Sequence, residues 1–163
     1  MSNHNYYRYG DQELITVPVD PETVVEIGDF ICIAVANDTT DDANVTTGYG
    51  CPPTYLVDGG DAAANRELGA DQFIGIAMSA SLEDAEDDII VATAGIFELE
   101  QKTAAAVVIG APVEMYADAT SCEDQTIVAG TTSPIGVCVE NKAATGTGVM
   151  VKILPQLLQN LGS

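Results

Sequence analysis

Apolar and polar positions follow one another along this chain in short runs that are separated by turn residues. The apolar runs are rich in Val, Ile and Ala, and Gly, Pro, Asn and Asp lie between them at near-regular spacing. This pattern is typical of an all-β sandwich or barrel. The expected strands are residues 14–19, 30–35, 54–57, 73–78, 88–99, 113–116, 126–128, 135–139 and 148–154.

Helical signal is slight. Residues 61–68, DAAANREL, predict one small helix, and the alanine-rich 100–109, EQKTAAAVVI, could wind briefly. Ser81 and Asp84 have the spacing of a capping box for one acidic turn. We therefore predict an all-β fold, a small β-barrel or tulip-like sandwich, with short helical turns and an extended N-terminal arm.

Three short segments occur twice, in the same order. The pairs are 27–34 with 109–117, 73–78 with 134–139, and 89–91 with 149–151. The first copy carries an extra stretch, 37–69, which a surface loop can absorb because loop-closure entropy grows slowly with length. Gly75 and Gly136 interrupt the strand pattern in both copies, which indicates a bulge or a close approach of two backbones. We therefore predict a pseudo-duplicated strand pattern.

A length of 163 residues suits one domain. We expect an N-terminal arm over 1–10, a single β domain over 11–154 that contains the 37–69 insertion, and a C-terminal tail over 155–163. The polar N-terminus predicts no signal peptide, and no run approaches the roughly 20 apolar residues that span a bilayer.

The chain carries 25 acidic residues against 5 Lys and Arg, which gives a formal net charge of −20. Such a chain repels nucleic acid and anionic lipid, so we expect neither nucleic acid nor membrane as a partner. Solubility or adaptation to salty water explains this charge as well as a body that stays dispersed until it meets one partner.

Residues with catalytic or metal-binding chemistry are few. The one histidine, His4, stands near the chain end, whereas acid–base and nucleophilic sites usually rely on a positioned histidine. The acidic clusters 38–42 and 83–88 lack the spacing of an EF-hand loop, so a solvated acidic loop competes with an irregular calcium site. No Cys-x-x-Cys pair is present, and we interpret all four cysteines as free thiols: Cys32, Cys51, Cys122 and Cys138. We expect no enzyme activity, no cofactor and no metal.

The N-terminal arm holds half of the six tyrosines, within the run Tyr6, Tyr7, Arg8 and Tyr9. Tyr and Arg are favoured anchors of protein interfaces because they combine contact area with a polar group. We hypothesise that these four residues form an interface with a neighbouring subunit. The alternative is that the rings cover one end of their own domain.

The ordered motifs of the second half resemble those of small bacteriophage capsid cement, or decoration, proteins. The motifs are GIFEL at 95–99, an alanine-rich stretch at 104–106, Gly-x-x-Val-x-apolar-aromatic at 110–116, a Thr-rich turn at 130–133, PIGVCV at 134–139 and VMV at 149–151. The first half also fits at 10–11, 14–17 and 25–33, whereas the 37–69 insertion departs from the family pattern.

The resemblance implies a structural virion protein without catalytic residues. Such proteins are made in the host bacterial cytoplasm and sit on the outer surface of the phage head, commonly as homotrimers. There they clamp adjacent major capsid protein subunits against internal DNA pressure. Two other functions stay open: a tail or baseplate β module of the virion, and a host- or carbohydrate-binding surface domain, which the absence of Trp disfavours.

Overall fold

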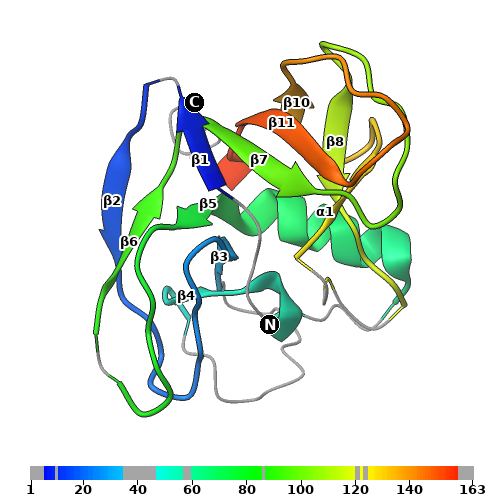
Figure 1. The fold of residues 1–163 in the computed structure, drawn as a ribbon. Helices are drawn as coiled ribbons and strands as arrows, with labels where there is room; N and C mark the ends of the chain where they lie inside the picture. The colour runs from blue at the N-terminus through cyan, green and yellow to red at the C-terminus, as the bar shows by residue number, and fades with distance from the viewer. Residues whose placement is uncertain are drawn as a thin grey trace.

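The structure is a computed structural model, and it describes residues 6–9, 11–34, 47–56, 60–85, 87–119, 122 and 125–157. Within these residues eleven strands form two antiparallel sheets, accompanied by the helix α1, one 3-10 turn and a short helical stretch at 156–157 (Figure 1). The five-stranded sheet holds β2 (Leu14–Val17), β3 (Phe30–Ile33), β4 (Gly50–Cys51), β5 (Phe73–Ala77) and β6 (Ile89–Ala92). The six-stranded sheet holds β1 (Tyr6–Tyr9), β7 (Ile96–Glu100), β8 (Pro112–Met115), β9 (Ile127–Ala129), β10 (Pro134–Cys138) and β11 (Gly148–Ile153).

The two sheets repeat one topology. Their strand orders are β2-β6-β5-β3-β4 and β1-β7-β11-β10-β8-β9. If β1 is set aside and the strands of each half are numbered one to five along the chain, both sheets have the order 1-5-4-2-3. Isolated bridges repeat in the same way. A parallel bridge joins Val19 to Gly50 in the first half and Gln101 to Ile127 in the second. The predicted duplication is therefore confirmed.

Gly75 and Gly136 lie where a neighbouring strand comes closest to the backbone. A Cβ on Gly75 would overlap the carbonyl oxygen of Ala92, and a Cβ on Gly136 would lie 2.6 Å from the carbonyl oxygen of Lys152. The strand pairing shifts register beside each glycine, between β3 and β5 and between β8 and β10. Both halves thus use a glycine for the bulge and close approach that the sequence predicted.

The predicted closed barrel is not found in the described part of the chain. Each half is an open sheet. Its two edges are joined only by the isolated parallel bridge, from Val19 to Gly50 in the first half and from Gln101 to Ile127 in the second. Residues 54–56, the described part of the strand predicted over 54–57, are not a strand, because Pro52 and Pro53 start the 3-10 helix η1 (Pro53–Tyr55). Residues 100–109 are not helical, and only Gln101 and Val107 in this stretch form bridges beyond the end of β7.

The insertion of the first copy supplies most of the helix α1 (Ala62–Gln72), which ends three residues beyond it. Asp61 caps it by accepting hydrogen bonds from the backbone N–H groups of Ala63 (2.8 Å) and Ala64 (2.9 Å). These bonds lower the pKa of the Asp61 carboxyl. The helix packs against β8 of the second half as well as β3 of the first.

One hydrophobic core joins the two halves. Phe30 and Phe73 of the first half meet edge to face, with ring centroids 6.0 Å apart, and share a buried cluster with Phe97 and Met115 of the second. A smaller buried cluster belongs to the first half alone and includes Ile31. The shared core makes the two copies one body, with loops at its two ends (Figure 1).

Candidate functional site

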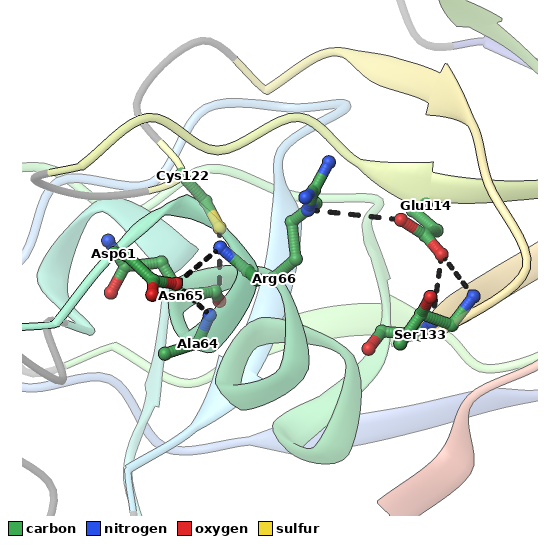
Figure 2. Close-up of polar contacts among 9 residues, drawn as sticks. Asp61, Ala64, Asn65, Arg66, Glu114, Cys122 and Ser133 are labelled. Atoms are coloured by element: carbon green, nitrogen blue, oxygen red, sulfur yellow. Dashed lines mark hydrogen bonds and ion pairs between the residues drawn. The ribbon is translucent and has the colours of Figure 1, made fainter.

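A group of polar contacts ties α1 to the second half. Glu114 on β8 is buried, and its Oε1 accepts hydrogen bonds from the backbone N–H groups of Thr132 (2.5 Å) and Ser133 (2.9 Å). The other carboxylate oxygen lies 3.8 Å from Nε of Arg66 on α1 (Figure 2). A Cβ on Gly130 would overlap this carboxylate, so the turn closes tightly around it. Glu114 therefore holds a turn and a helix in place.

Cys122 contacts the same helix at Asn65. Its Sγ is 3.5 Å from the backbone oxygen of Asn65, toward which the thiol donates (Figure 2). Burial raises the pKa of the Cys122 thiol to about 12, so it stays protonated at neutral pH and is a poor nucleophile. All four cysteines are buried and free, which confirms the prediction of free thiols.

The described residues contain no group of three or more His, Cys, Asp or Glu side chains that could hold a metal ion. The candidates in the first acidic cluster, together with Glu86 and His4, lie outside the described residues. In the second cluster Glu83, Asp84, Asp87 and Asp88 are exposed. None of the helices described is long and apolar enough to cross a membrane.

Two small surface pockets lie on opposite halves. One, of about 120 Å³, is lined by Glu98, Leu99, Glu100, Thr147 and Gly148. The other, of about 310 Å³, is lined by Pro18, Val19, Pro21, Tyr49 and Asp88. Neither lining holds a histidine or a cysteine, so neither pocket pairs an activated nucleophile with an imidazole base.

The predicted interface residues Tyr6, Tyr7, Arg8 and Tyr9 form β1. This strand pairs antiparallel with β7 of its own chain, with Tyr6 opposite Glu98, Tyr7 opposite Phe97 and Tyr9 opposite Ile96. The arm is therefore an edge strand of the second-half sheet, and its side chains lie outside the described part. A role for these four residues in binding a neighbour stays a prediction.

The sequence pattern did not indicate which large apolar side chains are exposed. Large exposed apolar residues of the described surface are Leu14, Ile15, Val24, Ile27, Leu82, Ile90, Val108 and Ile109. Some lie on the paired strands β2 and β6, and the others on turns that precede β3 and β8 or on the loop after β5. Two of them, Ile27 and Ile109, occupy the same position in the two halves.

Ile27 and Ile109 sit in matching four-residue turns. The following glycines have φ values of 95° at Gly28 and 84° at Gly110, which a type II turn requires. Their amides donate 2.8 Å hydrogen bonds to the last residues of β5 and β10, Ala77 and Cys138. The turn needs the glycine but not the isoleucine, and these side chains are 61% and 63% exposed. The Ile-Gly repeat was visible in the sequence, but it indicated the start of a strand rather than an exposed tip.

The comparisons with known proteins give one result. A family model of phage cement proteins matches residues 10–153, a range that includes β2 to β11 and therefore both halves of the fold. No curated protein and no solved structure matches the chain. The chain belongs to the phage cement protein family, which implies a structural, capsid-stabilising role in the virion.

Proposed function

We propose that this protein binds the outer surface of a phage head and cements adjacent major capsid protein subunits against internal pressure. The family match over residues 10–153 carries the proposal. The fold supports it, because a shared core and the contact of buried Glu114 with Arg66 join two similar halves into one body. Such a body can transmit load between two points of contact without rearranging.

We further propose that the protein acts on the head as a homotrimer. Linking three docking surfaces turns later contacts into intramolecular events, so weak individual contacts add up to firm attachment. This suits a protein that must stay dispersed at a net charge of −20 and yet remain on the shell once bound.

The proposal is tested by adding the purified protein back to expanded, undecorated heads of the phage that encodes it. We expect saturable binding and a higher temperature of head disruption, measured by calorimetry and by release of packaged DNA. Heads incubated with an unrelated protein of similar charge are the control, because they report any general effect of a polyanion.

Electron microscopy of the decorated heads gives the second readout. Density on the outside of the shell, at positions that contact more than one capsid subunit, is expected. Heads that neither bind the protein nor gain heat resistance would reject the cement function. Density confined to the tail or baseplate of the virion would favour the tail module instead.

A further inference from the structure

The matching turns of the two halves differ in charge. Aligning Gly28 with Gly110 pairs the residues around the two turns one to one. The pairs are Asp20 with Lys102, Glu22 with Ala104, Glu26 with Val108, and Asp29 with Ala111. Every acid in this part of the first half is thus replaced in the second by lysine, alanine or valine.

The loops beside the two turns differ in the same way. Bridges join Val25 to Ser81 and Val107 to Lys142, so each turn lies against the loop that follows β5 or β10. In the first half that loop contains the acidic cluster 83–88, whereas 143–147 in the second half reads AATGT. We call residues 102–110 and 142–147 the acid-free pole, and residues 20–29 and 81–88 the acidic pole.

The acid-free pole is exposed and largely apolar. Lys102 to Ala106, Val108 to Gly110 and Ala143 to Gly146 are all exposed, and Val108 is 65% exposed. Glu100 and Glu140 lie at its border. The two poles lie at opposite ends of the molecule, the acid-free pole beyond β8 and β10 and the acidic pole below β2 and β6 (Figure 1).

The two lysines of the acid-free pole lie along the protein surface. Lys142 Nζ donates to the backbone oxygens of Ala105 (3.0 Å) and Ala143 (3.1 Å), which ties the two loops together. Lys102 Nζ lies 4.7 Å from the centre of the Tyr116 ring. The pole is therefore held in shape before any contact forms, which lowers the entropy cost of docking.

We propose that the acid-free pole is the surface through which copies of this chain contact one another. The occupant follows from charge, because a second copy carries a net charge of −20 and like charges that face each other oppose association. Contact through the acid-free pole buries exposed Val108 and Ile109 and leaves the acidic poles pointing away from the contact. The inference rests on the proposed homotrimer, and it is tested on the free protein.

The test places an acidic residue of the first-half turn at the equivalent position of the second-half turn. Val108→Glu gives the second turn the residue that Glu26 already provides in the equivalent turn, so the fold is expected to accept it. The control is Leu82→Glu, which adds the same charge by replacing an apolar side chain that is 73% exposed at the acidic pole. Ile109→Ser and its counterpart Ile27→Ser form a second pair, which removes apolar surface without adding charge.

Sedimentation equilibrium in about 0.5 M NaCl measures the result, since the screening length there is only about 4 Å. We expect Val108→Glu to lower the association constant at least roughly tenfold, and Leu82→Glu to change it by less than about twofold. Ile109→Ser should weaken association more than Ile27→Ser does. Unfolding curves check that all four variants are folded.

Three outcomes would overturn the inference. Wild-type protein that stays monomeric at every salt concentration has no such contact. If Val108→Glu protein associates normally and also binds to heads, the acid-free pole forms neither contact and faces solvent. Val108→Glu protein that associates normally but fails to bind heads assigns the pole to the shell instead of a second copy. Heads that gain nothing from wild-type protein would reject the cement function and leave the sedimentation result to decide this inference.

Discussion

Asp29 shows how one residue can distinguish two copies of the same turn. Its Oδ2 accepts a 2.9 Å hydrogen bond from the backbone N–H of Glu26, and the residue is only 6% exposed. The pKa of the Asp29 carboxyl is raised from 3.8 to about 6, mainly by burial and to a lesser degree by the charge of Glu26, while the backbone hydrogen bond opposes the rise. The second half has Ala111 at this position and carries no titrating group there.

This raised pKa makes part of the stability depend on pH. Because the folded pKa lies above the unfolded value, the contribution is complete below about pH 4 and is lost as the pH rises through 6. Asp29→Asn keeps an acceptor oxygen and removes the charge. We expect it to increase the free energy of unfolding at pH 7 by about 1 kcal/mol, after discounting for solvent screening, and by much less at pH 4.

Urea unfolding of both proteins at several pH values between 4 and 7 measures the difference. Comparing the pair cancels the titration of the many other acids. A difference between the two proteins that does not change with pH would show that Asp29 is not the group responsible.

At the scale of the strand, the glycine bulges allow each sheet to bend. In both halves the glycine on the fourth strand faces the backbone of the fifth, at Ala92 and at Lys152. Gly75→Ala and Gly136→Ala each force a Cβ into that backbone, and we expect each to lower the free energy of unfolding by about 3 kcal/mol or more. Gly146→Ala is the control, with a positive φ of 78° but nothing within 4 Å of the new Cβ, and a cost of about 1 kcal/mol.

Chemical denaturation of the three variants provides the comparison. Failure of Gly75→Ala or Gly136→Ala to fold agrees with the expected direction, provided that Gly146→Ala folds. Equal stability of all three would mean that the strands can move apart at no cost.

The elements that the sequence predicted best are those with local causes. Strand alternation and the order of the repeated segments identified β3, β5, β8, β10 and β11, and Asp61 followed by alanines indicated α1. The single strand predicted over 88–99 is instead divided into β6 and β7. The strand predicted over 54–57 was wrong for its described residues 54–56, because two prolines start a 3-10 turn there. The possible helix over 100–109 did not form, because Gln101 and Val107 bridge to distant strands and loops instead.

The contacts of Glu114 and the exposure of Ile109 were harder to predict, because they have no local cause in the sequence. Nothing near Glu114 in the sequence reveals that its partners are the amides of Thr132 and Ser133 and the side chain of Arg66. Likewise, the exposure of Ile109 depends on how the turn projects from the folded sheet. Both features arise from tertiary structure, which a pattern of neighbouring residues does not encode.

At the scale of the whole molecule, charge sets the conditions for assembly. A homotrimer brings together three chains with a net charge of −20 each, and the screening length is about 30 Å at 0.01 M salt and about 8 Å at physiological salt. We therefore expect free trimers to be weak in low salt and to strengthen as salt is added. Sedimentation across a salt series measures this, and a stable trimer at micromolar protein in low salt would contradict it.

The helix α1 has a consequence for the orientation in which the molecule can bind a partner. The two halves share one topology, and α1 adds to the features that distinguish them, beside the additional strand β1 of the second-half sheet. The helix comes from one copy, rests on the other, and is fastened there by Glu114. Because the helix lies on one side of the molecule only, a binding surface that is complementary to it accepts the protein in a single orientation.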